Sequence, residues 1–158
     1  MKVLVVYYSR TGSTKKVAES ISKRLDCDIE EIDDNKNRKG IIGFLISLYE
    51  ALTHKKPEIK DPKKDPKKYD IVILGTPVWA HRMASLVRTY LDLMEDRIDN
   101  AAFFCTYDGS GSKSTFEDLE NMLGSSPVSK LPLKTDEFVE DVYRSKVDRF
   151  ISDVLDRF

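Results

Sequence analysis

The chain has 158 residues, with 26 Lys and Arg against 27 Asp and Glu, and a formal net charge of −1. Its length predicts one domain, residues 1–158, that can bury a core without disulfides or a structural metal. The balanced charge excludes a general nucleic-acid binder, which would carry a basic surface. The charge is uneven, however: residues 35–68 hold ten basic and four acidic residues, net +6, and the remainder is net −7.

The cysteine content and the hydropathy predict a reduced, cytoplasmic protein. Cys27 and Cys105 are too few for a disulfide framework or a zinc site, and the apolar neighbours of Cys105 favour a buried hydrophobic role. The N-terminus lacks the features of a signal peptide. The most apolar window, Ile41–Leu52, is 12 residues long, well short of the ~20 that a membrane span needs. We expect no metal and no membrane insertion.

Strand and helix patterns alternate along the whole chain. Continuous apolar runs predict buried strands, and weaker patterns predict two more, the last at a sheet edge because Pro132 interrupts it. Apolar residues at helical spacing predict a helix after each strand. In chain order the strands are Val3–Tyr8, 29–32, Tyr69–Leu74, Ala101–Tyr107 and Val128–Leu133, and the helices are Thr14–Leu25, Ile41–Leu52, 83–94, 116–123 and Asp136–Phe158. This alternation predicts an α/β fold of three layers, a parallel sheet with helices on both faces.

In such sheets ligands bind at the carboxyl ends of the strands, so the segments that follow the strands matter most. The first of them, Ser9–Thr14, holds four hydroxyl residues around Gly12 and precedes a helix. Unpaired amides at a helix N-terminus favour an anion, and the hydroxyls add donors without fixed charge. The pattern predicts a phosphate site. The alternative is a simple N-cap by Ser13 or Thr14.

The pattern Ser-x-Thr-Gly-x-Thr directly after the first strand resembles the FMN-phosphate loop of the flavodoxin family. The resemblance implies a short-chain flavodoxin-like fold, with five parallel strands in the order 2-1-3-4-5, and FMN as cofactor. It also implies that the phosphate is held by side chains and amides of this loop, with Arg10 contributing its backbone N–H. The residues concerned are Ser9, Arg10, Thr11, Gly12, Ser13 and Thr14.

Two further segments complete the resemblance. Gly75–Ala80 carries the only tryptophan, Trp79, and resembles the flavodoxin loop that packs against the isoalloxazine ring; the alternative is a Trp packed against the following helix. In the third segment, Thr106–Ser112, two glycines would let backbone amides approach the flavin ring, and Tyr107 either stacks on the ring or simply ends its strand. The remaining predicted cofactor contacts are Thr76, Pro77, Val78, Ala80, Thr106, Asp108, Gly109 and Gly111.

Two competing interpretations fail on the sequence. Gly109–Thr115 is superficially similar to a P-loop, but no glycine precedes Lys113. A receiver domain would need paired acids after the first strand and an Asp at the end of the central one, where this chain has Tyr-Ser-Arg and Thr-Pro-Val-Trp.

Three surface features distinguish the chain from acidic flavodoxins. His81 and Arg82 follow Trp79 and would place positive charge near the flavin, which favours its reduced anion and predicts a less negative potential. The basic stretch from Lys55 to Lys68 is expected to be a solvated linker remote from the flavin, with a docking site as the alternative. The helix Ile41–Leu52 is expected to be mainly a core element, with a contact at the crevice or in a dimer as the alternative.

Together these features predict an FMN-binding redox protein, a monomer or a homodimer. The first hypothesis is an electron carrier between partner proteins. The alternative is an enzyme, an NAD(P)H-dependent FMN oxidoreductase of quinones or flavins. A flavin-free binding module is a third alternative, which the three intact loops disfavour. The sequence identifies no catalytic acid or base.

Overall fold

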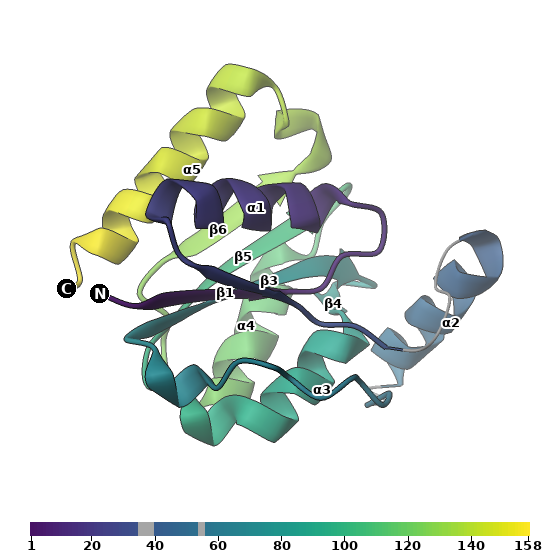
Figure 1. The fold of residues 1–158 in the computed structure, drawn as a ribbon. Coiled ribbons are helices and arrows are strands. Elements are labelled where there is room, and N and C mark those ends of the chain that lie inside the picture. Colours follow the sequence, from purple (N-terminus) through teal and green to yellow (C-terminus); the bar gives the residue numbers. More distant parts are fainter. Residues whose placement is uncertain (35–39, 54–55) are drawn as a thin grey trace.

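The computed structural model describes residues 1–34, 40–53 and 56–158. Within them, five parallel strands form a sheet in the spatial order β2-β1-β3-β5-β6, and the two-residue strand β4 pairs antiparallel with β3 (Figure 1). Counting the parallel strands along the chain gives the order 2-1-3-4-5, so the predicted fold is confirmed. The strands are β1 (Val3–Tyr7), β2 (Asp28–Glu31), β3 (Ile71–Trp79), β4 (Arg82–Met83), β5 (Ala101–Tyr107) and β6 (Lys130–Lys134).

The central strands are apolar without interruption because both faces of the sheet are covered. Successive side chains point to opposite faces, so each strand contributes to two separate clusters. One cluster contains Leu4, Val72 and Phe103, and the other contains Val5, Ile73 and Phe104, all fully buried or nearly so. Cys105 lies buried in the first cluster as predicted, and burial raises the pKa of its thiol to about 12.

Two pairs of helices form the outer layers, α1 and α5 over one face of the sheet and α3 and α4 over the other (Figure 1). The prediction of one helix over Asp136–Phe158 is partly wrong. A 3-10 turn at Thr135–Glu137 comes first, and α5 begins only after Val139, whose backbone is extended. The helices are α1 (Ser13–Leu25), α2 (Gly40–Leu52), α3 (Ser85–Met94), α4 (Ser112–Leu123) and α5 (Glu140–Leu155), with further 3-10 turns at Pro66–Lys68 and Glu95–Arg97.

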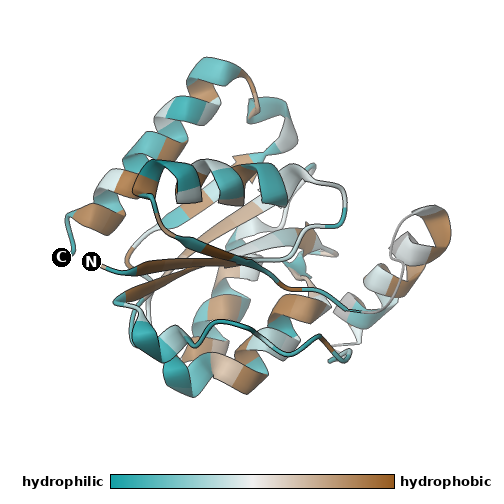
Figure 2. Ribbon diagram, viewed as in Figure 1, coloured by the Kyte–Doolittle hydropathy of each residue, from teal (hydrophilic) through white to brown (hydrophobic). Residues whose placement is uncertain are grey.

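Helix α2 stands apart from these layers, at the end of the molecule where the strands have their carboxyl ends (Figures 1 and 2). Six of its large apolar side chains are exposed to solvent, whereas the small and polar residues Gly43, Ser47 and Glu50 are buried. The expectation that this helix serves mainly the core is therefore wrong. The exposed residues are Ile41, Ile42, Leu45, Ile46, Tyr49 and Leu52.

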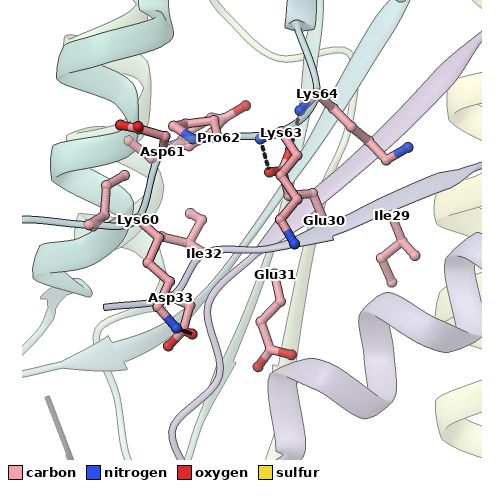
Figure 3. A pocket seen from close by; sticks show the side chains of 12 residues that line it. Ile29, Glu30, Glu31, Ile32, Asp33, Lys60, Asp61, Pro62, Lys63 and Lys64 are labelled. Atoms are coloured by element: carbon pink, nitrogen blue, oxygen red, sulfur yellow. Dashed lines mark hydrogen bonds and ion pairs between the residues drawn. The ribbon is translucent and has the colours of Figure 1, made fainter. Parts of the chain in front are cut away.

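The basic stretch that precedes β3 is held against the body by ion pairs. Lys60 pairs with Asp33 at 2.5 Å, and the Glu30 carboxylate accepts the backbone N–H groups of Lys63 and Lys64 (Figure 3). Similar pairs join Lys56 to Asp92, Lys64 to Asp28 and Lys67 to Asp99. The stretch is thus more than a solvated linker, because its cations neutralise acids of β2, α3 and the segment before β5.

A cavity of about 470 Å³ lies between β2 and this basic stretch. Its walls include Ile32 and Lys63 (Figure 3), and Ile59 and the buried Tyr90 also line it. None of the three segments predicted to contact the flavin lines this cavity. The cofactor site must therefore be sought elsewhere on the sheet.

Because β3 packs closely against β5, we expect that a side chain at position 75 would destabilise the fold. A Cβ atom at this position would overlap the ring of Phe104, which is fully buried and cannot swing out to solvent. Gly75→Ala should therefore destabilise the flavin-free protein by about 1–3 kcal/mol through overpacking, measured by urea unfolding.

Gly109 is the matched control, because a Cβ atom there meets nothing within 4 Å. We expect Gly109→Ala to change the free energy of unfolding by less than about 0.5 kcal/mol. Equal effects of the two substitutions would contradict the packing described here.

Candidate cofactor site

The parallel register brings the segments that follow β1, β3 and β5 to one edge of the sheet. Tyr7 is opposite Gly75, and Pro77 is opposite Thr106. The Tyr8 N–H donates to the Gly75 carbonyl at 3.1 Å, which extends the pairing into the first segment. The sheet thus brings together the three segments singled out by the sequence.

The first segment ends at the N-terminus of α1, which has an unusual start. Gly12 is the N-cap residue, with φ 103°, and no side chain caps the helix. The first turn contains no acidic residue, and the first helical hydrogen bond is that of the Lys16 N–H to the Gly12 carbonyl at 2.9 Å. The amides of the first turn therefore point toward this edge without partners inside the helix.

The alternative that Ser13 or Thr14 caps the helix is wrong, since both lie within its first turn. Thr14 is buried, and its hydroxyl lies 2.8 Å from that of Thr106 on β5. Ser9 and Ser13 are half-buried and Thr11 is exposed; the Ser9 hydroxyl accepts the Gly12 N–H at 3.1 Å. The hydroxyls thus divide into one that fixes the segment to the sheet and three that line the surface.

The second segment is a hairpin and not a loop, which corrects the expectation from sequence. β3 continues through Thr76, Pro77 and Val78 to Trp79, and then reverses into β4. The reversal occurs at Ala80 and His81, both with positive φ, of 48° and 63°. Two consecutive residues of this kind are typical of the tight turns that fit the twist of a β-hairpin.

The hairpin positions the side chains of the second segment. The buried Thr76 hydroxyl accepts the Ala84 N–H at 3.0 Å, which fixes the start of α3. Trp79 is 8% exposed and packs edge to face against Tyr8, with ring centroids 5.3 Å apart. A ring buried to this extent offers an edge and not a face to a ligand. The proposed contact of Trp79 with the flavin remains a prediction.

The third segment leads from β5 into α4. Gly111 is the N-cap of α4 with φ 107°, and, as at α1, no side chain caps this helix and its first turn holds no acid. Tyr107 is half-buried at the end of β5, and Gly109 is exposed. The Thr135 hydroxyl donates to the Asp108 carboxylate at 2.5 Å, which ties this acid to the turn after β6.

The hairpin tip and the third segment are in direct contact. A Cβ atom on Gly111 would lie 2.6 Å from the His81 Cα, so the backbones approach as closely as only glycine allows. The Ser110 hydroxyl lies 3.0 Å from His81 Nε2, and the Ser114 hydroxyl donates to the His81 carbonyl at 2.7 Å. These contacts form one rim of the site.

Of the two residues predicted to place positive charge beside Trp79, Arg82 shares one carboxylate with a second arginine, so the group keeps a net positive charge. Arg82 donates to the Asp118 carboxylate at 2.7 Å, and the same carboxylate receives Arg88 at 3.5 Å. Asp118 and Arg88 are almost entirely buried. This group could not be predicted from local patterns, because Asp118 lies 36 residues from Arg82.

The arrangement fits a phosphorylated, planar ligand such as FMN. Two uncapped helix N-termini open on the same edge, and each favours an anion through its amides and its dipole. Surface hydroxyls of the first segment add donors beside α1. Among the described residues, no group of three or more His, Cys, Asp or Glu could hold a metal ion, and no helix is long and apolar enough to cross a membrane.

Comparison with known proteins gives the family of the chain. The family model described as NADPH-dependent FMN reductase matches residues 1–130. The chain belongs to this family. No curated protein matches it. The matched residues of the chain include all three segments of the site and every strand of the sheet up to the first residue of β6.

Solved structures show the same fold. A flavoprotein from Lactobacillus acidophilus NCFM, solved in complex with FMN, is 27% identical, with a TM-score of 0.74 over 94% of this chain and 97% of that one. A flavodoxin from the domain Archaea is 18% identical, with a TM-score of 0.61 over 99% and 98% of the two chains. An NADH:FMN oxidoreductase in its apo form is 18% identical, with a TM-score of 0.62 over 96% and 87%. The predicted flavodoxin-like family and the FMN cofactor are confirmed.

Because the start of α1 is uncapped, we expect one substitution there to raise the stability of the protein and to lower its affinity for FMN. Ser13→Asp places a carboxylate in the first turn, where it should stabilise the flavin-free helix by about 0.3–1 kcal/mol through the dipole. The same carboxylate would repel the phosphate, so FMN affinity should fall by at least about tenfold, the factor that corresponds to 1.4 kcal/mol. Quenching of FMN fluorescence measures the affinity, and urea unfolding measures the stability.

Ser145→Asp is the matched control, because Ser145 is exposed on α5. This variant should leave FMN affinity unchanged. Retention of full FMN affinity by Ser13→Asp would show that the phosphate lies elsewhere.

Proposed function

We propose that this chain is an FMN-dependent NAD(P)H oxidoreductase that reduces a small acceptor such as a quinone or a free flavin. The observation that carries the proposal is the match of residues 1–130 to a family defined by NADPH-dependent FMN reduction. This match supports the enzyme, the alternative in the sequence analysis, better than the electron carrier placed first there.

The proposed phosphate site is the first turn of α1. Its amides and the hydroxyls of Ser9, Thr11 and Ser13 would hold the phosphate, and the Arg10 backbone N–H would add a donor. The Thr14 hydroxyl is already engaged with that of Thr106, so Thr14 would act by positioning the segment and not as a surface donor. The absence of an acid from the first turn supports this assignment.

The proposed ring site lies between the hairpin and the third segment. Tyr107, which is half-buried, is the better candidate for stacking, and Trp79 would offer an edge. Pro77, Val78 and Ala80 would line the ring on one side, with Thr76 buried behind them. Backbone amides at Gly109 and Gly111 would reach the polar edge of the ring, while Asp108 is held beside them by Thr135.

When bound, FMN supplies the redox chemistry, accepting a hydride from NAD(P)H and giving two electrons to the acceptor. The chain would bind the cofactor, orient it and leave one face open to both substrates in turn. The sequence contains no second dinucleotide motif, which supports this alternating use of one face. We assign no catalytic acid or base, consistent with the sequence analysis.

Rapid-mixing absorbance measurements on the FMN-loaded protein test this proposal. Mixing with NADPH or NADH under anaerobic conditions should bleach the flavin absorbance within seconds, with saturation as the nucleotide concentration rises. Addition of a soluble quinone should then restore the oxidised spectrum. Ser145→Asp again serves as the control and should react at the rate of the unmodified protein.

Reduction by dithionite or a partner reductase, combined with no reaction with either nucleotide, would overturn the enzyme and favour the electron carrier. Failure to retain FMN at all would instead contradict the cofactor site. The two outcomes are therefore distinguishable.

A further inference from the structure

The cavity between β2 and the basic stretch has no part in the proposed function, because no segment of the flavin site lines it. Helix α2, which follows β2 in the chain, stands apart from the outer layers, and residues 56–65, which form no helix or strand, lie against β2 in its place (Figures 1 and 3). The resulting cavity of about 470 Å³ falls within the range of ligand pockets, about 300–1,000 Å³.

Hydrogen bonds fix the wall of the cavity that lies opposite β2. The Lys60 N–H donates to the Asp33 carbonyl at 2.8 Å. The N–H groups of Lys63 and Lys64 donate to the Glu30 carboxylate at 2.5 and 3.1 Å. The two residues between these anchors also line the cavity (Figure 3). The cavity is therefore preformed, as ligand pockets usually are.

Apolar side chains from separate parts of the chain meet in this cavity. Ile32, after β2, is 5% exposed, and Tyr90, on α3, is 1% exposed; both belong to the core on this face of the sheet. Ile59 packs against the same core, and Pro62 adds a further apolar surface (Figure 3). These walls suit the flat, apolar body of a small organic molecule.

The Tyr90 hydroxyl adds a specific polar requirement. It is buried and has no hydrogen-bond partner among the described residues. Such groups are rare in folded proteins because an unmet hydrogen bond costs free energy. Burial and the charge of the Glu30 carboxylate raise the pKa of this hydroxyl, so it keeps its proton and can donate. Glu30 itself lines the cavity, which places the hydroxyl on that side of the Tyr90 ring.

The charged groups of the cavity nearly balance. Lys60 pairs with Asp33, and two further lining residues, Lys64 and Glu31, pair with residues outside the cavity. Within the described ranges, one lining cation and one lining acid remain without an ion pair. A charged ligand would thus lose its hydration without gaining a free counter-charge. The lining residues with charge are Glu30, Glu31, Asp33 and Asp61, and Lys60, Lys63 and Lys64.

We propose that this cavity binds a neutral, planar organic molecule with a carbonyl oxygen, such as an aromatic ketone or amide. The apolar walls would hold the ring of the ligand, and its carbonyl oxygen would accept the O–H of Tyr90. The site is distinct from the segments that form the cofactor site, so its occupation does not depend on the proposed oxidoreductase activity.

Residue-resolved nuclear magnetic resonance on the FMN-loaded protein tests the proposal, with acetophenone as the probe. Titration should shift the backbone amide signals of Ile32, Asp33 and Lys63, which line the cavity, until they saturate. The signals of Gly12 and Gly111, at the cofactor site, should not move. Benzoate and benzylamine carry the same ring with opposite charges, and both should bind more weakly than acetophenone.

Tyr90→Phe removes the hydroxyl and keeps the ring. It should weaken acetophenone binding by about threefold to tenfold, the effect of losing one neutral hydrogen bond. It should not lower stability in urea unfolding, since the hydroxyl has no partner in the described part of the chain. Tyr69→Phe is the matched control, because Tyr69 does not line the cavity and its hydroxyl donates to Asp28 at 2.7 Å. This variant should bind acetophenone like the unmodified chain.

Four results would overturn the proposal. The first is no saturable shift with acetophenone, and the second is a set of shifts confined to the cofactor site. The third is equal affinity of Tyr90→Phe and the unmodified chain for the probe. The fourth is tighter binding of benzoate or benzylamine, which would assign the cavity to a charged ligand. If Tyr90→Phe does not fold, the location of the shifts and the comparison of the three probes decide the question.

Discussion

The cofactor site depends on one constraint, the parallel sheet that places two uncapped helix N-termini at the same edge. Both α1 and α4 begin at a glycine with positive φ, lack a side-chain cap and have no acid in the first turn. In an ordinary helix a capping side chain would satisfy these amides. Here they remain available to a ligand, and the buried contact between Thr14 and Thr106 joins the first turn of α1 to the end of β5.

The fold places the basic middle of the chain beside acidic residues from other parts of the sequence. Lysines of the basic stretch before β3 pair with four acids. Asp28 lies on β2, Asp33 follows it, Asp92 lies on α3, and Asp99 precedes β5. Each exposed pair contributes little by itself, but together they hold this stretch, whose only regular element in the described residues is the 3-10 turn Pro66–Lys68, against the sheet and α3. Arg82 also pairs with an acid, Asp118, which it shares with Arg88. Cations from the basic middle of the chain are thus paired with acids from the remainder.

Much of the fold follows from the sequence because local patterns determine it. Unbroken apolar runs predicted the three central strands, and the glycine and hydroxyl residues after β1 predicted the segment that is proposed to hold the phosphate. Two features escaped prediction because they depend on contacts between distant residues. The turn of the hairpin, at Ala80 and His81, contains no glycine that would have indicated it. Its tip contacts Ser110 and Ser114. The outward orientation of α2 is accompanied by the contact of Glu50 with Ser85, 35 residues away.

The central claim is that the start of α1 holds the phosphate of FMN, and a comparison of FMN with riboflavin tests it most directly. Riboflavin has the same ring system but no phosphate, so isothermal titration of the flavin-free protein isolates the contribution of the phosphate. The account predicts that riboflavin binds at least about a hundredfold more weakly than FMN, since charge-assisted hydrogen bonds contribute about 1.5–3 kcal/mol each. Equal affinity for the two flavins would contradict the account.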